Sequence, residues 1–430
     1  MKITILATAL AAGTAAAALA APTTIHAGRL IAVPGKPARG PSTIVVDNGR
    51  IVSVTDSLAR VEPGAAFIDL STKTVLPGLV DSHVHLDSDR AGNEGLVAAF
   101  TESPQLGAYE TLWNARKTLA AGFTTVRNLG DSGSTLALRD AISRGWSVGP
   151  RIVDAGKSIS TTSGHMDSRL GIIEDFHPAI GEDNLCDGPE QCRRAVRRQV
   201  GRGVDVIKIA TTGGVNSRIG AGLGAQMFDD EAKAIIDTAR LYGKKVAVHA
   251  HGADGVNMAL AAGAASIEHG TLLDDESVRL FKKTGAYLVP TLSTVNGYLE
   301  RLAANPNAYA AEVLPKIRYR ISITGQNVQR AHPAGVKIAF GTDAGVSKHG
   351  RNADEFELMV KYGMTPVEAI KAATVNAADL LGLASEIGTI EPGKSADIIA
   401  VAGDPLSDVA VLKRVEFVMA RGEVAKTPAR

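Results

Sequence analysis

Nucleic-acid binding and membrane insertion are both disfavoured by what this chain of 430 residues lacks. Its 46 Lys and Arg face 45 Asp and Glu, and the resulting net charge of +1 leaves no basic excess for a phosphate backbone. Beyond the N-terminal leader, no uninterrupted apolar run reaches the ~20 residues of a membrane span. Aromatic residues are scarce at 4%, whereas hydrophobic residues make up 45% and glycine contributes 45 residues. We therefore expect a soluble mature protein with a large aliphatic core and many tight turns.

Cysteine is nearly absent as well. The two cysteines, Cys186 and Cys192, lie close together in LCDGPEQC. In an oxidising compartment they could close a small loop, but the spacing alone leaves open whether they do.

The N-terminus reads MKITILATALAAGTAAAALAAP. One lysine, an apolar stretch and small residues ending in Ala-Leu-Ala predict a secretory signal peptide over residues 1–20. A short membrane anchor is the weaker alternative, because the run is rich in alanine and is interrupted by threonine and glycine. We therefore expect a periplasmic or secreted protein that has no membrane contact after signal cleavage.

From residue 74 onward, short runs of β-branched and aliphatic residues alternate with amphipathic, helix-like stretches. This alternation is typical of repeated βα units around a parallel sheet. Eight candidate strands can be counted, and that number favours a closed (β/α)8 TIM-like barrel over an open sheet. They cover residues 74–83, 122–130, 150–156, 204–210, 244–250, 264–270, 285–292 and 336–345. The long connection that follows the seventh strand is expected to hold an extra helix or two.

The two ends of the chain do not show this alternation of strands and helices. Residues 22–73 and the tail from Gly388 contain short candidate strands, punctuated by Asn-Gly and Pro-Gly turns in the first segment. The economical interpretation is one small β-sandwich assembled from both ends. We therefore predict an α/β protein in four parts, namely the signal peptide (1–20), the first part of the sandwich (21–73), the barrel (74–383) and the second part of the sandwich (384–430).

Histidines and a carboxylate gather at the ends of the candidate strands. In a barrel of this kind, the C-terminal strand ends and the loops that follow them form the active site. The first strand ends in DSHVHLD, where alternation places His83 and His85 on the same side. Later strands end in VAVHAHG, IEHG and FGTDAG and contribute His249, His269 and Asp343. A lone strand histidine is more often a core or surface residue than a ligand, but a metal site requires such a joint set.

Lys208 is the most informative single residue. It lies between Ile207 and Ile209 in the candidate strand VDVIKIA, where a bare ammonium would be costly. Such a lysine must be paired, deprotonated or modified, and alone it could equally be a salt-bridged or snorkelling side chain. Among four histidines and an aspartate, a role as a bridging metal ligand is the better account.

These residues together resemble the amidohydrolase superfamily, and so do the segments LPGLVDSHVHL and GTIEPGKSADIIAV. The resemblance implies that Lys208 carries a CO2-derived carboxylate and bridges two divalent metal ions, commonly Zn2+. The implied ligands are His83, His85 and Asp343 for one ion, and His249 and His269 for the other.

Within the superfamily, the segments ISTTSGHMD, VDVIKIATTGGV, VAVHAHG and SIEHGTLLD look like the imidazolonepropionase-related branch. That branch contains Xaa-Pro dipeptidases and ochratoxin-hydrolysing carboxypeptidases. The resemblance therefore favours cleavage of an amide bond in a dipeptide or N-acyl amino acid, with release of a C-terminal amino acid. It also implies a homo-oligomer, with an octamer as one form.

The expected chemistry follows from the ligand set. Two cations would lower the pKa of a bridging water and polarise the scissile carbonyl, and Asp343 is placed to move a proton from that water to the leaving amine. His165 in TTSGHMD is expected to contact the substrate carbonyl, although an ordinary loop histidine is the alternative. His251 is expected to contact the substrate or to support a ligand. Arg218, in the Gly-rich stretch TTGGVNSRIGAGLGAQ, could receive a substrate carboxylate from a mobile flap, and an incidental arginine there is equally compatible.

Two other functions stay open. A deaminase or a cyclic-amide hydrolase with one metal ion is the nearest rival, but deaminases of this superfamily resemble one another in an HxxE pattern after the fifth strand, where this chain has Gly252. They also lack the bridging lysine. A catalytically silent relative that acts in binding or assembly is disfavoured because all six ligand positions are present. We therefore predict a binuclear amidohydrolase.

Overall fold

The computed structural model describes residues 22–61, 63–218 and 222–428. The predicted signal peptide lies outside the described residues. Within the described part, no helix combines the length and the apolar character needed to cross a bilayer.

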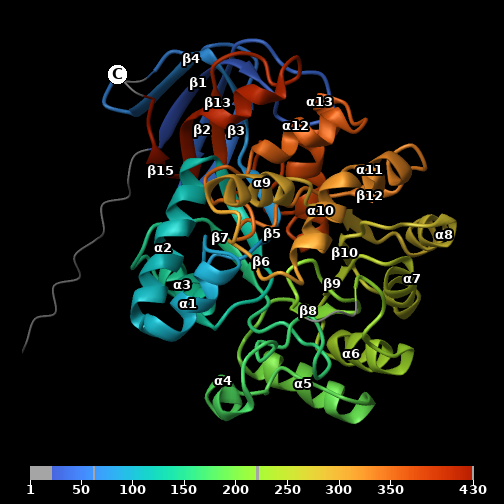
Figure 1. Ribbon diagram of the computed structural model, residues 1–430. Helices are drawn as coiled ribbons and strands as arrows, with labels where there is room; N and C mark the ends of the chain where they lie inside the picture. The colour runs from blue at the N-terminus through green and yellow to red at the C-terminus, as the bar shows by residue number, and fades with distance from the viewer. Residues whose placement is uncertain (1–21, 62, 219–221, 429–430) are drawn as a thin grey trace, which may run out of the picture.

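A seven-stranded sheet combines the two ends of the chain, and Figure 1 shows its blue and red strands side by side. In the order β15-β14-β13-β4-β1-β2-β3, its strands are β15 (Glu423–Lys426), β14 (Val415–Ala420), β13 (Ile398–Val401), β4 (Ala66–Pro77), β1 (Thr23–Leu30), β2 (Ser42–Asp47) and β3 (Arg50–Thr55). The join is antiparallel between β4 and β13, where Val75 pairs with Ala400. β4 extends to Pro77 and so crosses the boundary between sandwich and barrel that the sequence placed after residue 73. The division into four parts remains a prediction.

Parallel strands make up the centre of the chain. Three of them, β5 (Leu79–Val84), β6 (Phe123–Asn128) and β7 (Arg151–Asp154), form one sheet, and a five-stranded sheet holds β8 (Ile207–Ala210), β9 (Val246–Ala250), β10 (Ser266–His269), β11 (Tyr287–Val289) and β12 (Lys337–Ile338). Each predicted strand segment therefore contains one of these strands in whole or in part, and the α/β class is confirmed.

The first predicted strand was drawn too far toward the N-terminus. Residues 74–77 belong to β4 in the seven-stranded sheet, and only Leu79–Val84 forms β5. Gly78 lies between the two strands. Only glycine fits there, because a Cβ would lie 2.1 Å from the Thr124 hydroxyl oxygen. The sequence pattern ran continuously through this position because the last four residues of β4 and all of β5 are buried.

Two isolated bridges join strands of the parallel sheets to the segments that follow β12 and β7. Val84 forms an isolated parallel bridge with Ala344, and Ile159 forms another with Ile209. The Ile159 N–H donates to the Lys208 carbonyl at 2.8 Å. The first bridge holds the segment that carries Asp343 against β5, and the second holds the segment after β7 against β8.

Helices flank the parallel strands, as Figure 1 shows. They are α1 (Asn93–Thr101), α2 (Pro104–Ala120), α3 (Ser134–Ser143), α4 (His177–Ile180), α5 (Pro189–Gly201), α6 (Asp229–Leu241), α7 (Ala253–Ala262), α8 (Asp275–Thr284), α12 (Asp354–Lys361), α13 (Pro366–Lys371) and α14 (Ala377–Leu381). The long connection after β11 carries α9 (Thr294–Ala304), α10 (Leu314–Ser322) and α11 (Gln326–Ala331), one more than the sequence indicated. Local signals define several ends; for example, the Asp274 carboxylate caps α8 by accepting from Ser277 N at 2.7 Å.

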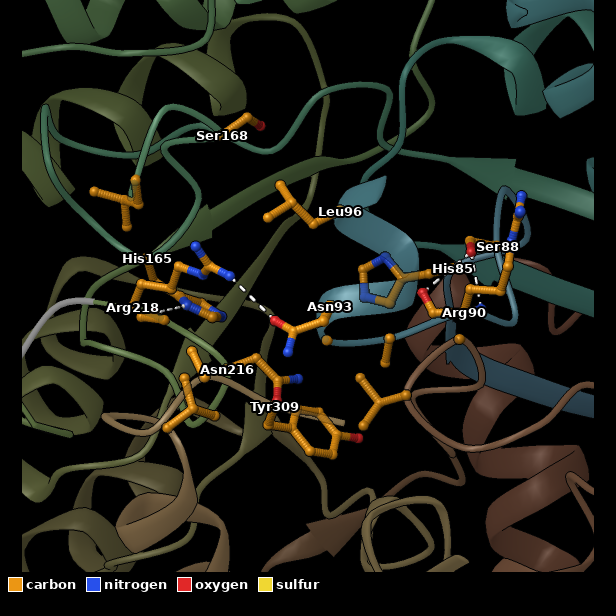
Figure 2. Close-up of a pocket in the computed structure, with 18 of the residues that line it drawn as sticks. His85, Ser88, Arg90, Asn93, Leu96, His165, Ser168, Asn216, Arg218 and Tyr309 are labelled. Atoms are coloured by element: carbon orange, nitrogen blue, oxygen red, sulfur yellow. Dashed lines mark hydrogen bonds between the residues drawn. The ribbon is translucent and has the colours of Figure 1, made fainter. Parts of the chain in front are cut away.

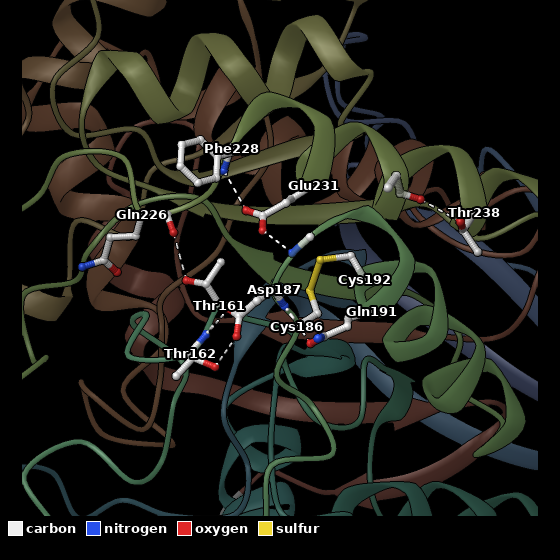
Figure 3. Close-up of a disulfide and its surroundings, with 12 residues drawn as sticks. Thr161, Thr162, Cys186, Asp187, Gln191, Cys192, Gln226, Phe228, Glu231 and Thr238 are labelled. Atoms are coloured by element: carbon white, nitrogen blue, oxygen red, sulfur yellow. Dashed lines mark hydrogen bonds between the residues drawn. A yellow bond between two sulfur atoms is a disulfide. The ribbon is translucent and has the colours of Figure 1, made fainter.

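The two cysteines form a disulfide, Cys186–Cys192, in which both residues are fully buried. Figure 3 shows the bridge joining a loop to α5. The next residue, Asp187, accepts from the Thr162 N–H at 3.0 Å and from its hydroxyl at 2.6 Å. The bridge therefore supports the loop that leads to His165.

Replacing both cysteines by alanine is expected to lower the free energy of unfolding by about 2 kcal/mol, because the bridge closes a short loop in the unfolded chain. Urea unfolding followed by circular dichroism measures the change. Wild-type protein unfolded with a thiol reductant is the matched control and is expected to lose a similar amount. Equal stability of the double variant and the oxidised wild type would contradict the expectation.

Candidate metal centre

Lys208 is buried among the predicted ligands without a hydrogen-bond partner for its amine. The side chain is 1% exposed, and its Nζ has no hydrogen-bond partner among the described residues. Burial lowers the pKa of Lys208 to about 8, because a low-dielectric site disfavours the charged amine. A neutral amine is nucleophilic enough to add CO2, and the resulting carboxylate would have two oxygens to offer to cations. The orphaned atom therefore fits a bridging role.

The structure brings all six predicted ligands together. His83, His85, Lys208, His249, His269 and Asp343 line one inner cavity of about 190 Å³. One candidate ligand atom each from His83, His269 and Asp343 lies within 4.8 Å of the others. The Asp343 Oδ1 is 3.2 Å from His85 Nε2 and 3.5 Å from His83 Nε2. These separations suit a donor set that converges on cations.

His251 also lies within ligand reach. Its ring, together with those of His249 and His269, forms a second group whose candidate ligand atoms all lie within 4.8 Å. The sequence assigned His251 to the substrate or to support of a ligand, and the geometry is compatible with both roles. Its Nδ1 lies 2.7 Å from the Thr271 hydroxyl, so Nε2 is the nitrogen left for the cavity.

Hydrogen bonds fix the rings of the other histidines. The His85 Nδ1 lies 2.9 Å from the Gly130 carbonyl, and the His269 Nδ1 lies 2.7 Å from the Thr291 hydroxyl. In both cases Nε2 is left as the ligand atom. His249 differs, because its Nε2 is 3.3 Å from the Gly213 carbonyl, which leaves Nδ1. Such partners set the orientation of metal-binding imidazoles and keep a ligand nitrogen free.

The ionisation states also suit a metal site. Burial, together with the charge of Lys208, lowers the pKa of His83 to about 4, and burial lowers the pKa values of His249 and His269 well below the usual range. These rings are therefore neutral at pH 7, which is the form that binds metal ions. Burial opposes ionisation of Asp343, but the neighbouring His83, His85 and Lys208 lower its pKa.

A buried ion pair beneath His83 was not predicted from the sequence. The Arg127 guanidinium donates to Glu268 Oε1 at 2.8 Å, and the other oxygen of Glu268 lies 2.9 Å from His83 Nδ1. Arg127 is 2% exposed and Glu268 is fully buried. Both charges lie in fully buried strands, β6 and β10, which are more polar in sequence than β8. Because these strands also contain other polar residues, neither charge stands out in the sequence as Lys208 does.

A Glu268→Gln substitution is expected to weaken metal binding by about 10- to 100-fold, because it removes the charge that orients His83. A chelator titration with residual metal measured after dialysis reports the affinity. Glu357→Gln is the matched control, since Glu357 is an exposed carboxylate of α12 that pairs with Lys413. Equal chelator sensitivity of the Glu268→Gln variant and the wild type would show that this carboxylate has no part in metal binding.

Three residues at the site have left-handed backbones. His269, Thr291 and Asp343 have φ values of 69°, 48° and 56°. A side chain in this region costs on the order of 1–3 kcal/mol and persists only where the surroundings impose it. His269 is the last residue of β10, whereas Thr291 and Asp343 lie in the segments that follow β11 and β12. The strain therefore coincides with the ligands, which is typical of functional sites.

A larger outer cavity of about 440 Å³ adjoins the inner one. His85, His165, Asn216 and Val346 line both cavities. Leu96, Leu170 and Val313 give the outer cavity an apolar part. The predicted ligands are therefore reached through a wider vestibule, whose lining Figure 2 shows.

His165 and Arg218 lie at different distances from the centre. The His165 ring is 4.1 Å from that of His249, and its Nδ1 is 2.5 Å from the Ser217 hydroxyl. Arg218 lines only the outer cavity, and its guanidinium donates to Asn93 Oδ1 at 3.2 Å, as Figure 2 shows. The histidine is thus beside the predicted ligands, whereas the arginine faces the vestibule.

The fold and the buried imidazole and carboxylate cluster at its strand ends are typical of metal-dependent hydrolases. Residues 74–425 match the model of the amidohydrolase family, and the chain belongs to that family. The protein is accordingly a hydrolase that acts on amide bonds.

Several known proteins are similar over most of the chain. An ochratoxinase of Aspergillus niger is 33% identical over 426 residues, which span 94% of this chain and 87% of that protein. The crystal structure of a Xaa-Pro dipeptidase with methionine bound in the active site is 39% identical, with a TM-score of 0.89 over 94% of this chain and 99% of the other. An imidazolonepropionase of a Geobacillus strain is 24% identical over 396 residues, 83% of this chain and 82% of that protein. These relatives confirm the branch predicted from the sequence motifs.

Proposed function

We propose that the chain is a binuclear metal-dependent amidohydrolase that releases a C-terminal amino acid. The observation that carries the proposal is the Lys208 amine, which is buried without a hydrogen-bond partner among the described residues at the centre of the ligand set. In this proposal Lys208 would carry a CO2-derived carboxylate and, as a shared ligand, would help to hold two divalent ions, with Zn2+ as the expected metal. The ligands are His83, His85 and Asp343 for one ion, and His249 and His269 for the other.

The proposal includes a closed (β/α)8 barrel. The parallel bridges of Val84 with Ala344 and of Ile159 with Ile209 support closure, because they bring the segments after β12 and β7 against β5 and β8 at the edges of the two sheets. A closed barrel also accounts for ligands from β5, β8, β9 and β10 facing one cavity, since strand ends in a barrel converge.

Asp343 and His165 have different roles in the proposed hydrolysis. Two bound cations would supply the Lewis acidity that lowers the pKa of water and polarises the amide carbonyl. Asp343 accepts the proton of the attacking water and passes it to the leaving amine. Burial lowers the pKa of His165 to about 3, so its imidazole is neutral at pH 7. If the Ser217 hydroxyl donates to Nδ1, the proton lies on Nε2 and can be donated to the carbonyl oxygen.

The relatives support the choice of substrates. The similarity to an ochratoxinase and to a Xaa-Pro dipeptidase favours dipeptides and N-acyl amino acids as substrates, with ochratoxin A among the candidates. The two adjoining cavities are compatible with a substrate that has one group on each side of the amide bond.

A substrate panel tests the proposal. Purified protein is expected to contain close to two metal ions per chain and to release amine from N-acyl amino acids and Xaa-Pro dipeptides. Cyclic amides and aminated heterocycles represent the imidazolonepropionase-type and deaminase alternatives. Turnover of cyclic amides alone would contradict the choice of reaction, and no turnover with intact metal content would favour a binding or assembly protein.

We also propose export and self-association. The buried disulfide supports an oxidising compartment such as the periplasm or the exterior. A homo-oligomer, with an octamer as one form, is the expected assembly, and light scattering after size exclusion measures it. A monomer across the working concentration range would contradict this part.

A further inference from the structure

Arg320 is a buried cation that faces the metal-binding cavity. It lies on α10, is 2% exposed, and lines the inner cavity together with the predicted ligands. Its guanidinium donates to the Thr291 carbonyl and to the Thr324 hydroxyl, both at 3.3 Å. Among the residues that the structure describes, no carboxylate forms an ion pair with it.

Arg127 provides a direct comparison. It is equally buried, but it donates at 2.8 Å to Glu268, its ionic partner. Burying a guanidinium without such a partner costs several kcal/mol, and its five N–H donors cannot be removed by deprotonation at ordinary pH. The two long hydrogen bonds of Arg320 to neutral groups therefore do not offset the free energy that is lost when its guanidinium is buried.

The nearest acidic groups are engaged elsewhere. Glu355 uses one oxygen to accept from Leu292 N at 2.8 Å and the other to accept from Ser293 N at 2.6 Å. Asp343 faces His83 and His85. The donors of Arg320 are thus left for a ligand that enters the cavity.

We propose that Arg320 binds the α-carboxylate of the amino acid released by hydrolysis, so that substrates must carry a free carboxylate beside the scissile amide. This inference rests on the proposed function and specifies its substrate class. In an N-acyl amino acid, the carboxylate is two bonds from the amide nitrogen and must share the cavity that holds the reacting carbonyl. Arg320 lines that cavity, whereas Arg218 lines only the outer one.

The cavity sizes support the same orientation. The inner cavity of about 190 Å³ corresponds to about six water volumes, which suits one amino acid but not a longer peptide. The outer cavity of about 440 Å³ is left for the acyl group. In this proposal Arg218 and the apolar side chains around it contact the acyl side of the substrate, and Arg320 takes the carboxylate role that the sequence suggested for Arg218.

The test compares a free acid with its carboxamide, for example N-benzoylphenylalanine and N-benzoylphenylalaninamide, by benzoate release. Wild-type protein is expected to prefer the acid. Arg320→Gln is expected to lower kcat/KM for the acid by about 30-fold or more, mainly through KM because the carboxylate is bound in both ground and transition states. Its activity on the carboxamide is expected to change far less. Arg218→Gln is the matched comparison and is expected to keep the preference for the acid.

A binding measurement separates this inference from the proposed function. Thermal shift with a panel of free L-amino acids and their carboxamides reports carboxylate binding whether or not the protein turns anything over. Absence of turnover in the wild type would contradict the proposed function alone. Retention of acid preference, or of amino-acid binding, in a folded Arg320→Gln variant would overturn the role of Arg320. If that variant does not fold, Arg320→Lys is used, and it is expected to lose about tenfold because an ammonium lacks the bidentate fork.

Discussion

Replacing Lys208 by alanine is expected to remove bound metal and to lower kcat/KM by about 10³-fold or more. The Lys208 amine is central to the ligand cluster and has no hydrogen-bond partner among the described residues. Without the shared carboxylate of Lys208, each cation would keep only its own ligands, and no negative group would lie between the two cations to offset their repulsion. Elemental analysis and kinetics on the same preparation measure both losses.

Two controls make the Lys208 result specific. Lys337→Ala removes an exposed lysine at the start of β12 and is expected to keep metal and activity. A short carboxylic acid added to Lys208→Ala is expected to restore part of the metal content, because it can occupy the space of the lost side chain and supply a bridging carboxylate. Full activity of the alanine variant without any addition would overturn the bridging role.

Replacing Asp343 by asparagine is expected to lower kcat by about 10³-fold or more while the protein stays folded. The amide has nearly the same size, so packing around the left-handed residue is kept, and asparagine tolerates this backbone better than most residues. Unlike the carboxylate, the amide cannot accept a proton. Its loss also removes an oxygen that lies 3.2 Å from His85 Nε2, so weaker binding of one metal ion is expected too.

Metal content and rate together identify what Asp343 does. If kcat falls even when excess metal restores two ions per chain, proton transfer is the missing function. If excess metal restores kcat, the residue is a ligand only and the proton-transfer role is wrong. Asp230→Asn is the matched control, since it removes an exposed carboxylate from the first turn of α6 and is expected to leave kcat unchanged.

Strand periodicity and strand-end chemistry were sufficient to predict the α/β class and the convergence of the ligands. Side-chain alternation puts His83 and His85 on one side, and parallel strands that end at a common edge bring His249 and Asp343 to them. Lys208 could be singled out because a charge inside an aliphatic strand is costly. All of these arguments use local sequence and one general property of parallel strands.

Arg320 and the Arg127–Glu268 pair illustrate what local sequence does not reveal. Arg320 belongs to a long connection between strands, and its position depends on how three helices pack over the strand ends. Nothing in the pattern of α10 distinguishes it from Arg318 in the same helix, which is exposed. Arg127 and Glu268 lie 141 positions apart, and only the packed structure identifies each as the partner of the other.

The pairing of β4 with β13 has a consequence for the order in which the protein folds. Val75 and Ala400 lie side by side, so the seven-stranded sheet cannot be completed until almost the whole chain has been synthesised. Until then, β4 has an unpaired edge that can bind other chains. Contacts between such distant residues also slow folding. A chain that folds late can remain unfolded long enough to be threaded through a membrane pore, and a truncation before residue 398 would leave the sheet permanently open.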